Sequence, residues 1–222
     1  WHEIGTIDLP EMIDYILKAT GQKSLFYIGH SQGTTTFFVM ASEKPEYNDK
    51  IRLMVALAPV AYMDGIPNKF FRFISPLLHF GHLLVPLLGK NEFLPDMTRL
   101  LDNIGQKVCE LSVINEVCSS ILFMICGWDS EQLDRNIVRV ILANTPAGAS
   151  TKQFLHYAQG VVSGKFRQYD YGRKGNIGKY GSRRPPEYAL ENIKAPVWIA
   201  YSQNDLMAAP TVGIRLPRCL NY

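Results

Sequence analysis

The chain has 222 residues, and its hydrophobic fraction of 47% is large enough for a buried core. Its net charge of +3 comes from 23 basic and 20 acidic residues without a long basic block, which argues against a nucleic-acid partner. The four cysteines form no Cys-x-x-Cys pair, so no metal site is expected. The most apolar stretch, residues 70–88, contains Arg72 and two prolines, which argues against a transmembrane segment.

The first part of the chain alternates between helix and strand patterns. Asp8 followed by Pro10 predicts a helix start, and Gly21 predicts its end. Short apolar runs without polar alternation predict strands that are buried on both faces of a sheet. The expected elements are helices over residues 8–20 and 34–42, and strands over residues 25–28, 51–58 and 196–201. This order predicts an α/β fold with a parallel sheet.

About 135 residues separate the second expected strand from the third, far more than a crossover needs. Apolar, helix-like stretches within this interval cover residues 70–88, 114–127 and 137–143. We therefore expect a core of residues 1–60 and 191–222 with a mainly helical insertion at 61–190. Residues 169–186 are rich in turn formers and basic side chains, and the expected structure there is a solvated loop. Its basic residues are Arg173, Lys174, Lys179, Arg183 and Arg184.

The motif Gly29-His30-Ser31-Gln32-Gly33 lies between the first expected strand and the second expected helix. A serine at such a tight turn stands free of its neighbours, within reach of a base and beside backbone donors. We predict that both glycines make room for the turn, that Ser31 is the strained nucleophile, and that Gln32 N–H faces the oxyanion. We expect His30 to shape the pocket or to pack. The alternative is an ordinary glycine-rich turn, because the bare motif recurs by chance in about one chain in a dozen of this length.

A nucleophilic serine on this fold is followed by an acid and then by a histidine. Asp205, in the polar turn after the third expected strand, is the candidate acid; a simple turn-forming aspartate is the alternative. All five histidines precede it, and we expect His79, His82 and His156 to be structural or surface residues. We therefore expect the catalytic histidine to lie beyond Tyr222, the second oxyanion donor to lie in a missing earlier region, and the 222 residues alone to be inactive.

Several segments together resemble the acid lipases, the family of gastric and lysosomal acid lipase within the α/β-hydrolase superfamily. The matching segments are DLPEMIDYILKATGQ, YIGHSQGTT, ALAPVA, EVCSSILFMICGWDS, SGKFRQYDYG and NDLMAAP. The resemblance runs through nearly the whole chain, which looks like the middle of such a lipase. Residues 144–150, NTPAGAS, depart slightly from the NPAGTS usual in the family.

The resemblance implies roles for individual residues. Ser31 matches the nucleophile, Gln32 the oxyanion residue and Asp205 the acid. Spacing alone leaves Cys109 and Cys118 open between a short disulfide loop and two buried thiols; the resemblance matches them to the family's disulfide and implies an oxidising compartment, secreted or lysosomal. Cys126 matches an unpaired thiol, and Cys219 has no counterpart.

The resemblance also implies a reaction and a substrate. The expected activity is hydrolysis of carboxylic esters of neutral lipids at a lipid–water interface, through an acyl-enzyme and without a cofactor. Residues 61–190 would then form a cap and lid. Candidates for the apolar surface of this cap are Phe70, Phe71, Phe73, Leu77, Leu78, Leu83 and Leu84. The alternatives are an acyltransferase, a short-chain esterase, or a non-catalytic relative that binds lipid.

Overall fold

The computed structural model describes residues 1–79, 92–93, 148–208 and 210–219, with single positions at 127, 134, 137 and 140. The described helical segments are η1 (Ile4–Asp8), α1 (Leu9–Thr20), α2 (Gln32–Glu43), η2 (Pro45–Lys50), α3 (Lys69–His79), α8 (Thr151–Ser163), α9 (Gly172–Tyr180), η3 (Leu190–Asn192) and α10 (Pro210–Cys219). The described strands are β1 (Leu25–His30), β2 (Ile51–Leu57), β3 (Glu92–Phe93), β4 (Ala149–Ser150) and β5 (Val197–Ala200).

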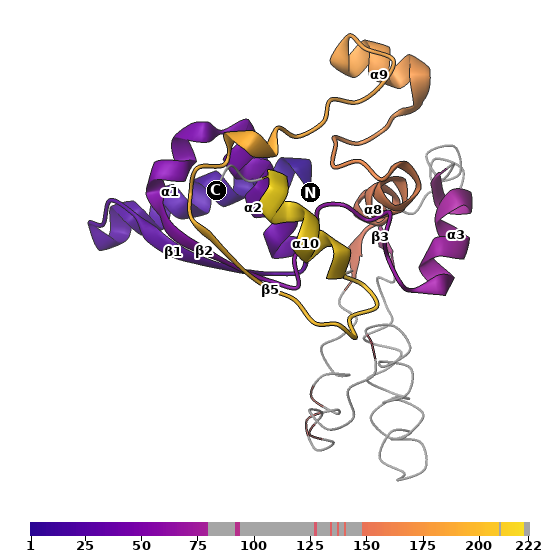
Figure 1. Ribbon diagram of the computed structural model, residues 1–222. Helices are drawn as coiled ribbons and strands as arrows, with labels where there is room; N and C mark the ends of the chain where they lie inside the picture. Colours follow the sequence, from indigo (N-terminus) through magenta and orange to yellow (C-terminus); the bar gives the residue numbers. More distant parts are fainter. Residues whose placement is uncertain are drawn as a thin grey trace.

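Strands β1, β2 and β5 form a parallel sheet in that order (Figure 1). Their carboxyl ends are in register, since His30 lies opposite Leu57 and Leu57 lies opposite Ala200. The short strands β3 and β4 form a separate antiparallel pair. The expected α/β class and the parallel sheet are therefore confirmed, and each of the three expected strands differs from the observed one by no more than two residues at either end.

Helix α2 is the centre of the core. Its residues from Thr34 to Ser42 are all buried, and Phe37, Phe38 and Met40 have no exposed surface. The helix packs on β1 and is flanked by η1, η2 and η3. A helix that is buried on nearly every side lies inside a domain, so the segment that follows Ser31 is held rigidly by its surroundings.

Asn48 ties the amino ends of β2 and β5 to the end of α2. Its amide nitrogen donates to the carbonyl oxygens of Ala41 and Pro45, at 3.0 and 2.9 Å. Its amide oxygen accepts hydrogen bonds from the N–H groups of Lys194 and Ala195. Since Asn48 is buried, these bonds satisfy polar groups that would otherwise be costly to bury.

The expected helix start is confirmed, since α1 begins at Leu9, but Asp8 does not cap the helix with its side chain. Asp8 has helical dihedral angles and makes no capping hydrogen bond through its side chain, because the π-helical segment η1 leads directly into α1. Pro10 is nevertheless tolerated in the first turn of α1, where its missing N–H costs little. The expected end is confirmed, since Gly21 closes α1 in the left-handed conformation with φ of 65°.

The expectation that the strands are buried on both faces is also wrong for the described residues. Phe26 and Ile28 of β1 are 64% and 69% exposed, and Trp198 of β5 is 55% exposed. Ile28, Val55 and Trp198 lie in register across the three strands, so these side chains share one face. Helices α1 and α2 lie against the opposite face (Figure 1), and no element of the described part of the chain covers this one.

The basic stretch is more ordered than the expected solvated loop. Residues 172–180 form helix α9 in spite of three glycines, and Asn176 at its centre is buried. The Asn176 amide nitrogen donates to Asp170 Oδ1 at 2.8 Å and to the Arg183 carbonyl oxygen at 3.1 Å. Hydrogen bonds from this buried side chain to residues six and seven positions away have here overridden the low helix propensity of glycine.

Within the expected insertion, the structure describes residues 61–79, 92–93 and 148–190 and the single positions 127, 134, 137 and 140. Helix α3 covers the first part of the expected stretch 70–88 and packs against α8 (Figure 1). Residues 114–126, 138, 139 and 141–143 lie outside the described residues, as do Leu83 and Leu84. Phe70, Phe73 and Leu77 are exposed on α3. Among the described helices, none is long and apolar enough to cross a membrane.

Candidate active site

Ser31 lies at a sharp turn between β1 and α2. Its dihedral angles, φ of 50° and ψ of −114°, fall outside the regions that are comfortable for residues with a side chain. The turn is held from both sides: Ser31 N–H donates to the Leu57 carbonyl oxygen of β2 at 3.0 Å, and the Ser31 carbonyl oxygen accepts Thr34 N–H at 2.9 Å. Ser31 is half-buried at this turn.

The two glycines of the motif have different roles. A Cβ added to Gly29 would lie 2.9 Å from the backbone carbon and oxygen of Gly33, a contact that the chain would have to relieve by moving. A Cβ added to Gly33 would meet only the Tyr27 hydroxyl, at 3.9 Å. The prediction of close approach therefore holds for Gly29, whereas a side chain at Gly33 has room.

This difference predicts opposite effects for two matched variants. Gly29→Ala is expected to lower the free energy of unfolding by about 1–3 kcal/mol, because the added methyl group overpacks a backbone contact. Gly33→Ala is expected to leave stability within about 1 kcal/mol of the starting protein or to raise it, since alanine is a better helix former. Urea unfolding of both variants in the complete protein measures the difference. Equal losses would contradict the steric assignment.

Thr34 and Thr35 join the serine turn to the segment after β2, which the sequence did not suggest. Thr34 Oγ1 donates to the Ser31 carbonyl oxygen at 2.6 Å and accepts Val60 N–H at 3.0 Å. Thr35 Oγ1 donates to the Val60 carbonyl oxygen at 2.8 Å. Both threonines are buried, so the position of Ser31 is fixed by two neighbouring connections of the sheet.

Asp205 lies in the loop that follows β5. Its Oδ1 accepts the N–H groups of Met207 and Ala208, both at 2.8 Å, and the residue is half-buried. Gly127 packs on this loop, since a Cβ there would fall 1.9 Å from the Asn204 carbonyl oxygen. The Asp205 side chain and the backbone at Gly127 thus hold this loop in place.

Ser31 and Asp205 belong to the same edge of the sheet. Ser31 directly follows His30, and Asp205 follows Ala200 by five residues, while Leu57 lies between these two strand ends in register. Ala58 N–H continues the edge by donating to the Ala200 carbonyl oxygen at 2.8 Å. Ala58 is also strained, with φ of 49°. Among the described residues, no hydrogen bond joins Ser31 to Asp205 or to a histidine.

The described histidines do not form a base for Ser31. His30 is exposed at the turn. His156 is buried, stacks on Trp1 with 3.7 Å between ring centroids, and donates from Nε2 to the Arg167 carbonyl oxygen at 2.9 Å. His2 Nδ1 lies 3.0 Å from the Tyr188 hydroxyl. The expectation that His156 is structural is confirmed, while His82 and the His79 side chain lie outside the described residues.

Because His156 is buried, the free energy of unfolding is expected to decrease at acidic pH. Burial lowers the pKa of His156 from 6.5 to about 3. Between these two pKa values the imidazole of the unfolded chain binds a proton and that of the folded chain does not. The free energy of unfolding therefore decreases as the pH is lowered, by up to about 1.4 kcal/mol per pH unit. Urea unfolding at several pH values between 7 and 4 measures this slope. The matched variant His156→Asn is expected to have a shallower slope, and an unchanged slope would contradict the assignment.

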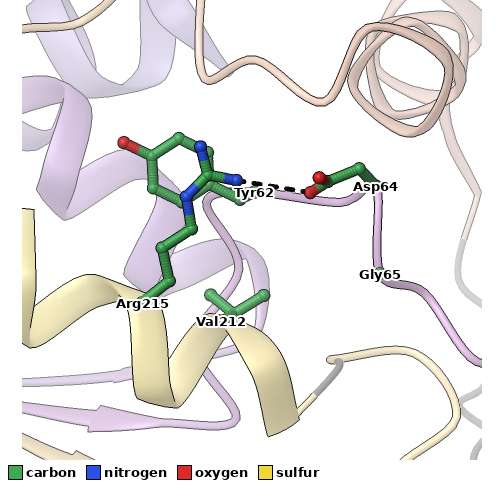
Figure 2. A pocket seen from close by; sticks show the side chains of 5 residues that line it. All are labelled: Tyr62, Asp64, Gly65, Val212 and Arg215. Carbon is green, nitrogen blue, oxygen red and sulfur yellow. Dashed lines mark ion pairs between the residues drawn. The ribbon is translucent and has the colours of Figure 1, made fainter.

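One pocket lies elsewhere, between the segment after β2 and helix α10 (Figure 2). Its volume is about 250 Å³, and its lining residues are Tyr62, Asp64, Gly65, Val212 and Arg215. The Arg215 guanidinium stacks on the Tyr62 ring at 3.7 Å and pairs with Asp64 at 3.5 Å. No residue of the predicted site lines this pocket.

The described residues offer no cluster of histidine, cysteine and carboxylate side chains that could hold a metal ion. Cys219 is a free thiol that accepts a hydrogen bond from the Tyr62 hydroxyl at 3.6 Å. Cys109, Cys118 and Cys126 lie outside the described residues, as does any bond between them.

The comparisons with known proteins agree with one another on the family to which this chain is similar. Residues 1–102 match the family model described as the alpha/beta hydrolase fold. The chain is 45% identical to Lipase 3 of Drosophila melanogaster over 92% of this chain and 52% of that protein. It is 38% identical to the gastric triacylglycerol lipases of Rattus norvegicus and Homo sapiens, over 99% of this chain and 55% and 54% of those proteins. The chain therefore spans about half the length of these relatives.

Proposed function

Because this chain belongs to the α/β-hydrolase fold family and is related to the gastric and insect lipases, we propose that the protein containing it is a serine lipase. Its substrates would be carboxylic esters of neutral lipids, such as triacylglycerols or cholesteryl esters. The observation that carries the proposal is the strained Ser31 at the turn from β1 to α2, with φ of 50°. Strain of this kind persists where the surrounding structure enforces it, and it is common at catalytic residues.

The environment of Ser31 supports a role as nucleophile. Gln32 is the first residue of α2, so its N–H has no partner within the helix and lies at the positive end of the helix dipole. A backbone N–H at this position can stabilise the oxyanion that forms when a serine attacks an ester. The buried hydrogen bonds of Thr34 and Thr35 to Val60 keep this donor and Ser31 in a fixed relation.

In the proposed mechanism Ser31 Oγ attacks the ester carbonyl carbon, and its proton passes to a histidine outside this chain. The oxyanion accepts hydrogen bonds from Gln32 N–H and from a second donor, also outside this chain. Collapse of the intermediate expels the alcohol, which takes the proton from the histidine, and leaves an acyl group on Ser31. Water then hydrolyses the acyl-enzyme. No cofactor takes part.

Asp205 would orient the histidine and stabilise its protonated form. Its Oδ1 already accepts two backbone N–H groups, so Oδ2 is the oxygen proposed to accept the histidine Nδ1–H. The two hydrogen bonds hold the carboxylate in one orientation. This is the arrangement that a triad acid requires, because a rotated carboxylate would not fix the ring.

The insertion at residues 61–190 would act as the cap and lid of this lipase. Phe70, Phe73 and Leu77 form an exposed apolar stripe on α3, and such a stripe is suited to contact with an insoluble ester. A Cys109–Cys118 disulfide and a secreted or lysosomal location form part of the proposal. Peptide mapping of the unreduced protein would detect that disulfide directly.

Covalent labelling with a fluorophosphonate tests the proposal. We expect the complete protein to be labelled, with the label mapped by mass spectrometry to the peptide that contains Ser31, and to hydrolyse emulsified triacylglycerol or cholesteryl ester. The Ser31→Ala variant and residues 1–222 alone are expected to remain unlabelled, the latter because the base lies outside them. A folded complete protein that takes no label, or takes it at another serine, would sink the proposal and favour a non-catalytic lipid-binding relative.

A further inference from the structure

Helix α9 lies at the tip of an excursion that leaves the core near Phe166 and returns near Tyr188. The two connecting segments pair with each other, since Gln168 N–H donates to the Pro186 carbonyl oxygen at 2.9 Å and Tyr188 N–H to the Phe166 carbonyl oxygen at 3.0 Å. Phe166 and Tyr188 are buried in the main core. Figure 1 shows α9 standing clear of the sheet at the end of these segments. The tip is therefore a projecting unit on an anchored base.

The charge of this tip is one-sided. Residues 171–186 contain five basic residues and no acidic residue, although the whole chain has nearly balanced charges. All five basic side chains are exposed. We define the α9 basic patch as Arg173, Lys174, Lys179, Arg183 and Arg184. No ion pair within the described part of the chain involves any of them.

The nearest acidic side chains do not neutralise the patch. Asp170 Oδ1 accepts Gly172 N–H and the Asn176 amide, and its Oδ2 pairs with Arg167 at 3.2 Å. Glu187 pairs with Lys165 at 3.1 Å. These contacts instead give the patch a fixed shape, because the buried Asn176 connects the start of α9 to Arg183 beyond its end.

The remaining surface of α9 suits a flat, partly apolar partner. Ile177 is 49% exposed between the basic residues. A Cβ added to Gly178 would meet no atom within 4 Å, so the backbone here faces open space without a side chain in front of it. Basic side chains around a single exposed aliphatic residue are the elements by which a peripheral segment binds a lipid surface with anionic headgroups.

We propose that the α9 basic patch binds phosphate-bearing headgroups of an anionic lipid surface and keeps the protein on the interface that carries its ester substrate. This inference rests on the proposed lipase function for its purpose, because an insoluble substrate must be met at an interface. Attraction to the surface would be electrostatic and therefore weakened by salt. A single projecting tip without an exposed aromatic side chain for base stacking favours lipid over nucleic acid.

Vesicle sedimentation tests the proposal on the complete protein. Phosphatidylcholine vesicles that contain phosphatidylserine are expected to bind it, and vesicles of phosphatidylcholine alone to bind it much less. The double variant Arg183→Gln/Arg184→Gln is expected to weaken binding to the anionic vesicles by about 25-fold, since each basic residue near such a surface contributes about fivefold. The control Lys18→Gln/Lys23→Gln, which removes two exposed lysines near the amino end of β1, is expected to change binding by less than about twofold.

Equal binding to the two kinds of vesicle, or unchanged binding of the arginine variant, would overturn the proposal. Binding to polyglutamate but not to anionic vesicles would also overturn it and would point to an acidic protein partner. A soluble short-chain ester separates this inference from the lipase proposal. The arginine variant is expected to hydrolyse that ester at the normal rate. A protein that binds anionic vesicles but hydrolyses no ester would support the proposed lipid-binding patch and contradict the proposed lipase function.

Discussion

Replacing Ser31 by alanine in the complete protein is expected to lower kcat for ester hydrolysis by about a millionfold, the loss seen when a serine nucleophile is removed from a triad. The reason is that the hydroxyl group proposed to receive the acyl group is gone. Initial rates on an emulsified triacylglycerol and on a soluble ester would measure the loss for both kinds of substrate. A variant that kept most of its activity would show that the nucleophile is another residue.

The backbone of Ser31 supplies an independent control. With φ of 50° and ψ of −114°, this position favours glycine over any residue with a Cβ. Ser31→Gly and Ser31→Ala are both expected to be inactive, but the glycine variant is expected to be more stable by about 1–3 kcal/mol because it relieves the strain. Thermal or urea unfolding of the pair measures this. If the alanine variant were equally stable, the turn would not be strained in the protein.

Replacing Asp205 by asparagine is expected to lower kcat by about ten-thousandfold, as for the matching substitution in a known triad. The asparagine carbonyl oxygen can still accept the N–H groups of Met207 and Ala208, so the loop should keep its shape. What is lost is the negative charge that fixes the histidine tautomer and stabilises its protonated form. Rates and unfolding midpoints, measured together, are expected to show an inactive but normally stable protein.

Asp205→Ala is the companion variant. It should lose activity to a similar extent and should also lower the free energy of unfolding by about 1–3 kcal/mol, because two backbone N–H groups lose a charged acceptor. An asparagine variant with full activity would support the alternative weighed from the sequence, in which Asp205 only forms the turn. An asparagine variant as unstable as the alanine variant would contradict the described hydrogen bonds.

Much of the fold could be predicted because it depends on local patterns. The apolar runs at residues 25–28, 51–58 and 196–201 coincide with strands to within two residues at either end, and the glycine at position 21 ends a helix. These features need only hydrophobic periodicity and the freedom of glycine to adopt a positive φ. The placement of Ser31 between a strand and a helix followed in the same way, from the apolar run before the motif and the helical pattern after it.

The errors arose where contacts outside a short motif override the local preference of that motif. The stretch over residues 169–186 was expected to be a loop, but Asn176 makes hydrogen bonds to Asp170 and Arg183 that stabilise a glycine-rich helix. Asp8 was expected to cap a helix, but the segment before it is already helical. Residue types alone do not specify that Asn176 bonds to partners six and seven positions away, or that η1 continues into α1.

The sequence by itself therefore determined the α/β class, the order of the strands along the chain and the candidate pair Ser31 and Asp205, because each depends on residue types within a few positions. Only the tertiary structure decided which glycine is sterically required, how Thr34 and Val60 hold the serine turn, and that His156 is a buried structural residue. The physical reason is that steric clash, burial and hydrogen bonding are properties of surroundings. Those surroundings are assembled from segments far apart in the chain, as when Val60 meets Thr34 across 26 positions.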